Sequence, residues 1–417
     1  MHKGIKIPEK ALRFIRGADY PLPVVLDGNW VNSLGIVRGL GIEGINSVVI
    51  NHAEGGASFY SKYPGASLIC PTPWEEPEEF ISFMEKLGEN FKDRSVLLVT
   101  DDTYLRVLSE GKNRLEEYYR YSFPDFNTLI KIMDKNYQYK TAEKLGIRVP
   151  KSECVNNSGD LAKLDNINFP ALVKGLEGKE FFRTFGKQVL NVSSRKEILD
   201  ILDQLPVGKV IVQEQIVGDE SNLYSYCCYM DPEGEVKCQF TGRKLHQYPR
   251  EFGTCSIAKS VECSEIIEPS MNLLRKMGFF GVAQVEYKRK PETGQFYLIE
   301  VNARFWKWHS LATACNINFS SVAYFDLINE PYTCSPDQKY GLKWVVFPEE
   351  ILGAISDLKK KKFKLISWTR KIFPPFVFGL FSIKDPLPWL MMLIHRLLLQ
   401  KKNQIKSVSS QIFFNIS

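Results

Sequence analysis

The sequence predicts a protein of mixed class, with a doubly wound parallel sheet in an N-terminal α/β domain and antiparallel sheets in the α+β region that follows. Apolar runs alternate with helical stretches in the first third, which is typical of a parallel sheet. Turn sequences join apolar runs in the middle, at residues 231–234 and 291–294, and predict hairpins. A basic and apolar stretch after residue 330 predicts a C-terminal extension. With 417 residues, 44% of them apolar and 24% charged, the chain is globular and not disordered.

The first third supplies short buried strands that end in turns. The predicted strands are residues 23–27, 47–51, 67–70 and 95–100. Gly28 to Gly35 lacks the Gly-x-Gly-x-x-Gly pattern of a dinucleotide site, so a tight strand-to-helix turn is the favoured interpretation.

The middle of the chain predicts a helix over Thr128 to Leu145, which Gly146 ends in the C′ position. The other expected helices are residues 194–204 and 265–277. The expected strands are residues 169–174, 209–214, 222–230, 235–241, 281–288 and 295–302.

The last predicted hairpin carries three candidate metal ligands. Glu300 and Asn302 share one face of their strand, because strand side chains alternate. A two- or four-residue loop would point Glu286 to the other face, whereas a three-residue loop ending at Gly294 would set it opposite Glu300. We expect the second register, because Gly294 can adopt the left-handed conformation that such a loop needs. Two adjacent carboxylates repel, so a divalent cation accounts for them better than a solvent-exposed face.

Two weaker signals precede this hairpin. Lys174 ends the run Ala-Leu-Val, where it would either extend to solvent or bind a phosphate. The loop from Gly175 to Gly186 carries Lys179 and Arg183, and it would either close over phosphates or form a surface hairpin.

The order of these parts resembles the ATP-grasp superfamily over about residues 20–330. The resemblance rests on Asp134-Lys135, on Phe-Pro-Ala-Leu-Val-Lys174 and the glycine-bounded loop, on Glu214-Gln-Ile-Val, and on Glu286 followed by Glu300-Val-Asn-Ala-Arg304. The run Asn302-Ala-Arg-Phe-Trp306 is similar to that of carboxylate–amine ligases, including the D-aspartate ligase type. Gly175 follows the lysine where many relatives have proline, and Phe181, Phe182 and Phe185 make the loop bulkier than usual.

The resemblance implies ATP and Mg²⁺ or Mn²⁺ as cofactors, and it assigns a role to each matching residue. Lys135 and Lys174 would contact the α- and β-phosphates, with Gly178 and Lys179 in the loop above them. Gln215 and Val217 would meet the adenine edge, Glu214 would begin that hinge, and Glu220 would reach the ribose. Glu286, Glu300 and Asn302 would hold the metal. Arg304 would steady the γ-phosphate or the acyl phosphate, and Arg243 and Lys244 would lie near the acceptor carboxylate.

The resemblance divides the chain into four parts. These are a Rossmann-like domain (1–125), a central subdomain with the phosphate loop (126–208), a C-terminal subdomain with the metal site (209–330) and the extension (331–417). It implies an ADP-forming ligase that activates a carboxylate as an acyl phosphate and joins it to an amine, on an envelope or polysaccharide precursor. A phosphotransferase using the same ATP site is the alternative, and a non-catalytic nucleotide-binding module is disfavoured by the complete metal triad. His309, after Trp306-Lys-Trp308, would be a general base or, as we favour, a packing residue.

Two features of the sequence, its cysteines and its extension, indicate where the protein is located. Nine cysteines without a Cys-x-x-Cys pair indicate reduced thiols in a cytoplasmic protein. The formal charge of +6 resides in the extension, which holds 14 of the 54 Lys and Arg but 5 of the 48 Asp and Glu. Residues 359–399 therefore predict either peripheral membrane contact or a helix packed on the body, with the packed form slightly favoured. Nucleic-acid binding is not expected, because the lysine run lacks interleaved aromatic residues.

Overall fold

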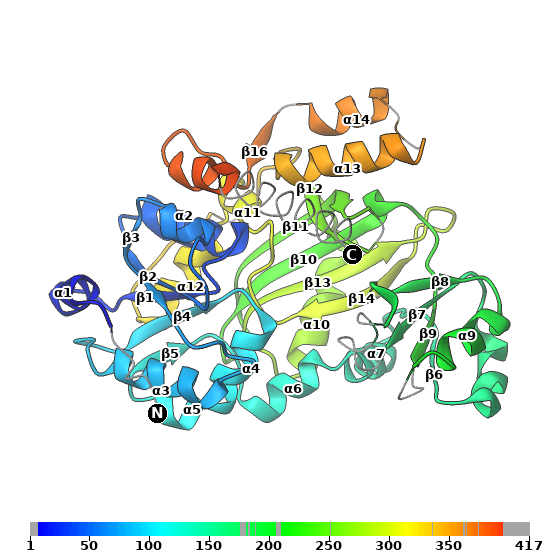
Figure 1. The fold of residues 1–417 in the computed structure, drawn as a ribbon, viewed down its shortest axis with the longest axis horizontal. Coiled ribbons are helices and arrows are strands. Elements are labelled where there is room, and N and C mark those ends of the chain that lie inside the picture. The colour runs from blue at the N-terminus through cyan, green and yellow to red at the C-terminus, as the bar shows by residue number, and fades with distance from the viewer. Residues whose placement is uncertain are drawn as a thin grey trace, which may run out of the picture.

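The computed structural model contains three sheets, which follow one another along the chain (Figure 1). It describes residues 7–175, 181, 184–187, 189–205, 210–250, 252–335, 337–361, 363, 365–373 and 375–394. Helices cover the first sheet, while the second and third face each other across the cavity described below.

The first sheet is parallel and has the strand order β3-β2-β1-β4-β5. Its strands are β1 (Pro23–Leu26), β2 (Ser47–Asn51), β3 (Pro64–Ile69), β4 (Ser95–Val99) and β5 (Tyr119–Tyr121). The surrounding helices are α1 (Glu9–Gly17), α2 (Val31–Ile42), η1 (Ala57–Tyr60), α3 (Pro77–Gly88), α4 (Asp102–Glu110) and α5 (Lys112–Leu115). The order reverses between β1 and β4, which is the point where sheets of this kind bind ligands. The predicted parallel sheet is confirmed.

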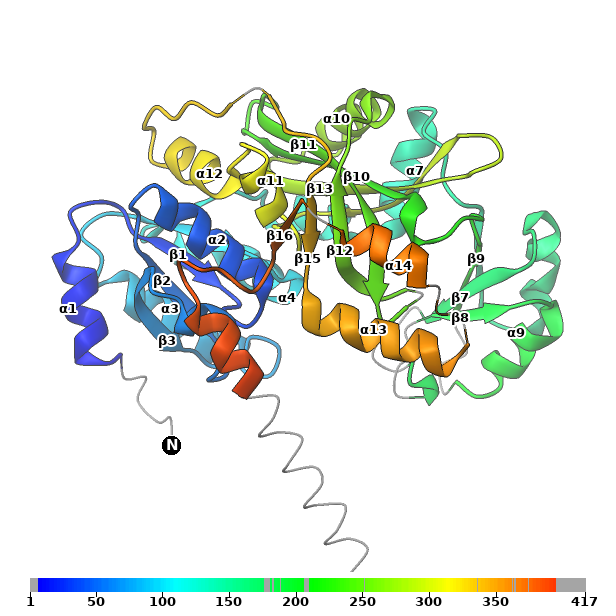
Figure 2. The same cartoon turned by 90° about the horizontal axis from the view of Figure 1, so that it is seen from above.

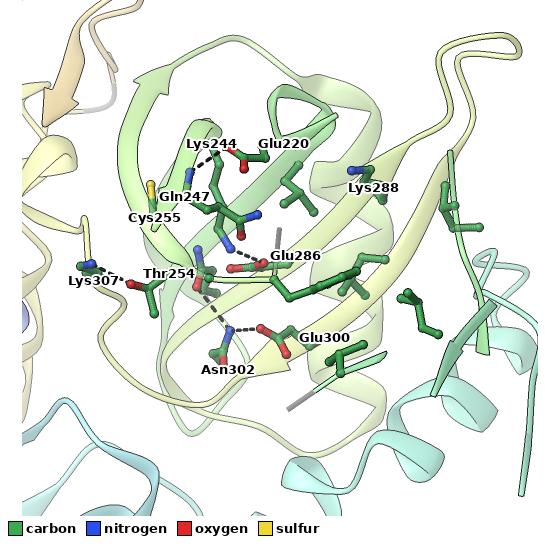
Figure 3. A pocket seen from close by; sticks show the side chains of 18 of the residues that line it. Glu220, Lys244, Gln247, Thr254, Cys255, Glu286, Lys288, Glu300, Asn302 and Lys307 are labelled. Carbon is green, nitrogen blue, oxygen red and sulfur yellow. Dashed lines mark hydrogen bonds and ion pairs between the residues drawn. The ribbon is translucent and has the colours of Figure 1, made fainter. Parts of the chain in front are cut away.

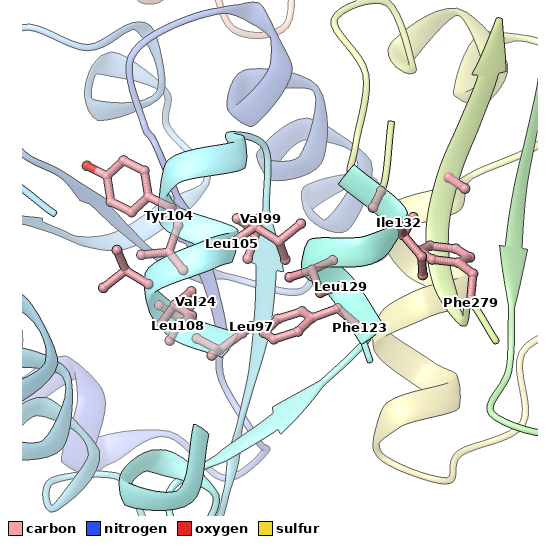
Figure 4. Packing of buried hydrophobic residues seen from close by; sticks show 14 of the residues in the cluster. Val24, Leu97, Val99, Tyr104, Leu105, Leu108, Phe123, Leu129, Ile132 and Phe279 are labelled. Atoms are coloured by element: carbon pink, nitrogen blue, oxygen red, sulfur yellow. The ribbon is translucent and has the colours of Figure 1, made fainter. Parts of the chain in front are cut away.

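Apolar side chains join this sheet to the rest of the molecule. Leu97 and Val99 of β4 pack beside Leu105 and Leu108 of α4 (Figure 4). The same core continues through Leu129 and Ile132 to Phe279, so the first sheet and the third share one hydrophobic core.

The helix predicted over residues 128–145 is two helices, α6 (Phe126–Met133) and α7 (Lys135–Lys144). Asp134 separates them because its backbone is extended (ψ 115°) and its carboxylate accepts a hydrogen bond from the Asn136 N–H at 2.7 Å. An aspartate in this position caps a helix N-terminus. The break places Lys135 in the first turn of α7. Gly146 ends α7 with φ +73°, as predicted.

The second sheet is small and antiparallel, with the order β6-β9-β7-β8. Its elements are β6 (Ser152–Val155), η2 (Ser158–Asn166), β7 (Ala171–Gly175), β8 (Leu190–Val192), α9 (Arg195–Leu202) and β9 (Val210–Glu214). Since β9 pairs with β6 and β7, the domain boundary predicted after residue 208 separates β9 from its own sheet.

The third sheet has seven strands in the order β14-β13-β10-β11-β12-β15-β16. They are β10 (Leu223–Met230), β11 (Val236–Tyr248), β12 (Thr254–Ser260), β13 (Gly281–Arg289), β14 (Phe296–Asn302), β15 (Lys343–Val345) and β16 (Phe376–Phe378). Its accompanying helices are η3 (Glu220–Asn222), η4 (Ser264–Ile266), α10 (Ile267–Lys276), α11 (Ser310–Ala314) and α12 (Phe319–Leu327).

The β13–β14 hairpin brings Glu286 opposite Glu300, as predicted, but by a different route. Lys290 donates to the Gln295 carbonyl, so the loop has four residues and the predicted three-residue loop is wrong. A β-bulge at Ile299 then shifts the register by one residue, because Tyr287 pairs with Leu298. The Tyr139 hydroxyl of α7 donates to the carbonyl of Ile299 at 2.9 Å and stabilises the bulge.

The described part of the extension packs on the body, as the favoured interpretation predicted. Strands β15 and β16 extend the third sheet, and α13 (Phe347–Lys359) and α14 (Leu365–Ile372) lie between them in the chain. Helical residues 387–394 follow β16 (Figures 1 and 2). Buried ion pairs hold the extension against the body. Arg38 lies 3.0 Å from Asp385, and Arg250 lies 2.8 Å from Glu350. None of the helices in the described ranges has the length and apolar character needed to cross a bilayer.

Candidate active site

A cavity of about 1480 Å³ lies where the second and third sheets meet the ends of β1 and β4. Strands β7 and β9 form one wall, and β11, β13 and β14 form the opposite wall. Trp30, Asn32 and Asp102 come from the first domain, and Glu349, Asp357 and Lys371 come from the extension. The lining of the cavity therefore includes residues from the first domain, from the second and third sheets and from the extension.

The predicted metal ligands meet on one wall of this cavity (Figure 3). Glu286 and Glu300 are opposite each other on β13 and β14, and Asn302 follows on the same face as Glu300. The Asn302 amide donates to Glu300 at 3.3 Å, which leaves its carbonyl oxygen available. Two carboxylates and one carboxamide oxygen thus lie together, as the sequence predicted.

Three lysines surround these ligands. The Lys244 ammonium lies 2.8 Å from the Glu286 carboxylate, and the Lys135 ammonium lies 3.0 Å from that of Glu300. Lys174 of β7 donates to the Gln213 side chain at 2.8 Å. The break at Asp134 places Lys135 in the first turn of α7, from which it reaches Glu300, so each carboxylate is paired with one lysine.

The electrostatics of this cluster follow from burial and from the ion pairs. Burial raises the pKa of Glu286, against the effect of Lys244. Burial would also raise the pKa of Glu300, but Lys135 and Lys244 lower it to about 2. Burial lowers the pKa of Lys174 to about 8, with a contribution from Lys135. Glu300 therefore ionises more readily than Glu286.

The donor set fits a magnesium ion that is completed by a substrate. Mg²⁺ typically binds one or two carboxylates together with substrate phosphates and water. Within the described ranges, no cluster of three or more His, Cys, Asp and Glu side chains is arranged to hold a metal. Two carboxylates and one amide oxygen leave coordination positions open, so phosphate oxygens would supply the rest.

Arg304 lines the cavity, but its guanidinium is held by the first domain. It donates to both carboxylate oxygens of Asp102, from Nε at 2.8 Å and from Nη2 at 3.0 Å. Asp102 is the first residue of α4, shortly after the end of β4. Burial raises the pKa of nearby Asp27 to about 6, and the charge of Asp101 raises it further. The sequence analysis missed Asp102, although acidic residues following β4 at the strand-order reversal were a usable signal.

Some of the residues predicted to bind the nucleotide line the cavity, and others do not. Glu214, Gln215 and Glu220 line it, and Glu220 accepts a hydrogen bond from the Gln247 N–H at 2.9 Å. Val217 is 54% exposed and is not a lining residue. Gly178 and Lys179 lie outside the described residues, as does Arg183.

Arg243 is not in the cavity, which corrects its assignment to the acceptor site. Adjacent residues of a strand point to opposite faces, so Arg243 and Lys244 cannot both line one wall. Lys244 shares a face with Glu286, whereas Arg243 contacts the Tyr224 hydroxyl at 3.2 Å and stacks over its ring. Of these two neighbouring residues, Lys244 therefore lines the cavity and Arg243 does not.

Further lining residues were not predicted. Gln284 precedes Glu286 by two residues on the same strand face, and strand alternation was the signal that could have found it. Lys307 contacts Glu349 of α13 at 2.5 Å and the Thr254 hydroxyl at 2.8 Å. No sequence pattern indicated that the extension would reach this wall.

His309 is fully buried and does not line the cavity, which agrees with a packing role. Its Nε2 lies 2.7 Å from the carbonyl of Asn32, at the start of α2. Burial lowers its pKa to about 4. The neutral ring therefore donates this hydrogen bond at physiological pH.

The chain is similar in sequence and in fold to known proteins. Residues 215–317 match the family model described as the carbamoyl-phosphate synthase L chain, ATP binding domain. A D-aspartate ligase of Enterococcus faecium (strain Aus0004) is 23% identical over 317 residues, which cover 70% of this chain and 74% of the relative.

Two solved structures have a similar fold. An ADP complex of N5-carboxyaminoimidazole ribonucleotide synthetase gives a TM-score of 0.61 at 13% identity, covering 82% of this chain and 85% of the other. An L-amino acid ligase from Bacillus licheniformis gives 0.55 at 17% identity, covering 74% of each chain. The matched family segment contains Lys244, Glu286, Glu300, Asn302 and Arg304.

Proposed function

We propose that the chain is an ATP-grasp protein and that it acts as an ADP-forming ligase that joins a carboxylate to an amine. The observation that carries this proposal is the cluster of Glu286, Glu300 and Asn302 with Lys135, Lys174 and Lys244 in one cavity. Two carboxylates among three cationic side chains suit a metal-bound polyphosphate.

We place the nucleotide between the second and third sheets. Leu172 and Ile211 of the second sheet and Ile299 of the third line this part of the cavity, and apolar side chains suit a purine ring. Gln215 and Glu220 offer polar groups beside it. The phosphates would then reach Lys174 and Lys135, where each lysine gives charge compensation.

Glu286, Glu300 and Asn302 would hold Mg²⁺ or Mn²⁺, which when bound neutralises charge on the transferred phosphoryl group. Lys135 and Lys244 now contact the two carboxylates, so each would turn towards phosphate oxygens once the metal takes its place. Arg304, anchored by Asp102, would contact the transferred phosphoryl group.

The reaction has two steps. A carboxylate oxygen of the first substrate attacks the γ-phosphorus of ATP, the bond to the β-phosphate oxygen breaks, and ADP leaves. The amine of the second substrate then attacks the acyl carbon, phosphate leaves, and the nitrogen loses a proton to give an amide. Positioning and charge stabilisation carry both steps, so no protein nucleophile is required.

Amino acids are the first substrates to test, because two similar proteins are named as amino acid ligases. The ATP requirement and the nine free cysteines support a cytoplasmic site of action. A narrower form of the same proposal is that one substrate is a precursor of the cell envelope or of a polysaccharide.

The test is an ADP-release assay with Mg²⁺ and pairs of amino acids, with product mass measured in parallel. We expect ADP release that needs both a carboxylate and an amine, and a product whose mass fits their amide. Release with a hydroxyl acceptor and no amine would instead establish the phosphotransferase.

The variant that probes the metal ligands is Glu300→Gln, which removes one charge and keeps the shape. We expect at least a hundredfold loss of turnover. Glu292→Gln in the exposed loop of the same hairpin is the control and should leave turnover unchanged. Full activity of Glu300→Gln would refute the metal assignment.

A further inference from the structure

In the extension, acidic side chains face the body of the protein and most basic side chains face the solvent, which the sequence did not reveal. Between residues 347 and 394 there are four acidic residues, and each forms an ion pair with a cation of the body. The pairs are Glu349 with Lys307, Glu350 and Asp357 with Arg250, and Asp385 with Arg38. These carboxylates are thus neutralised on the inner side of the extension.

Five basic residues of the same segment face the solvent, whereas Lys371 lines the cavity and donates to the Leu245 carbonyl. Lys359 ends α13, and Lys360 and Lys361 follow it. All three are exposed, as are Arg370 of α14 and Lys384. In the part of the chain that the structure describes, none of these five cations has a carboxylate within ion-pair distance. The outer side of the extension is therefore positively charged, although the segment also contains acids.

Apolar side chains are exposed beside these cations. The inner face of α13 carries Glu350 and Asp357, and its opposite face exposes Ile351, Ile355 and Leu358. Leu365 and Ile366 of α14 are 61% and 69% exposed. The helices α13 and α14 and helical residues 387–394 lie along one side of the molecule (Figures 1 and 2). We call their exposed apolar and basic side chains the tail surface.

We infer that the tail surface binds the anionic surface of a lipid bilayer. Shallow insertion of Leu and Ile side chains, flanked by lysines that meet anionic headgroups, is the mode of interfacial helices. A second copy of the chain fits less well, because it would bring unpaired lysines against unpaired lysines. The surface accordingly favours lipid, and this inference is independent of the proposed chemistry.

The test is sedimentation of the full chain with phosphatidylcholine vesicles, with and without phosphatidylglycerol. We expect binding only when phosphatidylglycerol is present, and weaker binding in 1 M salt, where the Debye length falls to about 3 Å. The double variant Leu365→Glu with Ile366→Glu should bind at least tenfold less, because it replaces inserted side chains by charges that anionic lipid repels.

The matched control is Ile42→Glu, since Ile42 is 66% exposed at the end of α2 in the first domain. It should bind vesicles as the wild type does. Thermal shift with an ATP analogue and Mg²⁺ in the same samples reports folding and nucleotide binding separately from lipid binding.

Three results would overturn the inference. They are no sedimentation with phosphatidylglycerol, equal sedimentation of the double variant, and a wild-type dimer in light scattering that the double variant dissociates. The last result would assign the tail surface to a second copy. None of them would bear on the ligase activity.

Discussion

Lys244 and Glu286 form a buried ion pair at 2.8 Å, with side chains 11% and 7% exposed. The pair lies at the centre of the candidate site and links β11 to β13. In the absence of a cation, the ammonium is the group that compensates the Glu286 carboxylate. The same lysine would thus serve both the fold and the proposed reaction.

Lys244→Met should destabilise the protein, because it leaves the Glu286 carboxylate buried without a counter-ion. Removing one partner of a buried pair typically costs about 3–5 kcal/mol. Urea unfolding measures the change, and Lys276→Met on exposed α10 is the control. Adding Glu286→Gln to Lys244→Met should recover part of the loss, since the uncompensated charge is then removed. A single variant as stable as the wild type would show that the pair is not important for folding.

Asp102→Asn should slow turnover by about tenfold to hundredfold, because the Arg304 guanidinium loses its bidentate anchor and small misplacements are costly. The KM for ATP should change little, since Asp102 would act on the transferred phosphoryl group only through Arg304. Steady-state kinetics separate kcat from KM. Asp93→Asn, in the surface pair with Arg120, is the control. An equal effect of both variants would argue against a positioning role for Asp102.

The affinity for ATP should fall as the pH rises through about 8, where buried Lys174 loses its proton in the free protein. The sign follows from the charge, since only the ammonium form attracts phosphate. Lys174→Arg remains protonated over this range and should shift the decline to higher pH. Calorimetric titration with a non-hydrolysable ATP analogue measures both proteins. Parallel pH profiles would remove Lys174 from the phosphate site.

Acid should destabilise the protein through His309. Its pKa is about 4 in the folded state and about 6.5 in the unfolded chain. The unfolded state therefore binds more protons between these values, and stability falls as the pH drops from about 6.5 to 4, by ~1.4 kcal/mol per pH unit at most. His309→Gln keeps a donor for the Asn32 carbonyl and should flatten this slope. An unchanged slope in urea unfolding from pH 4 to 6.5 would contradict the assignment.

The strands and the metal face could be predicted because they depend on local patterns. Alternation on β14 fixed Glu300 and Asn302 on one face, and apolar runs located β1, β2 and β4. The loop of the last hairpin was predicted wrongly, because the bulge at Ile299 depends on a hydrogen bond from Tyr139, far away in the sequence. Gly294 adopts its left-handed conformation in the four-residue loop as well, so it could not decide the register.

Other differences arise from competing local signals. Asp134 lies in a continuous helical pattern, and its capping hydrogen bond interrupts that pattern. Arg243 and Lys244 were assigned together by resemblance, although strand alternation alone excludes one of them from the site. Asp102 could have been found from topology. Glu349 could not, because its place beside Lys307 results from long-range packing of the extension.

The two short strands of the extension have a consequence for shortened versions of the protein. Without β15 and β16, the seven residues of β12 would become the open border of a large antiparallel sheet, with unpaired N–H and C=O groups. Such borders recruit strands from other molecules. Removal of the extension after residue 330 should therefore yield a chain that aggregates, because in the full chain β15 pairs with Ile257, Ala258 and Lys259 of β12.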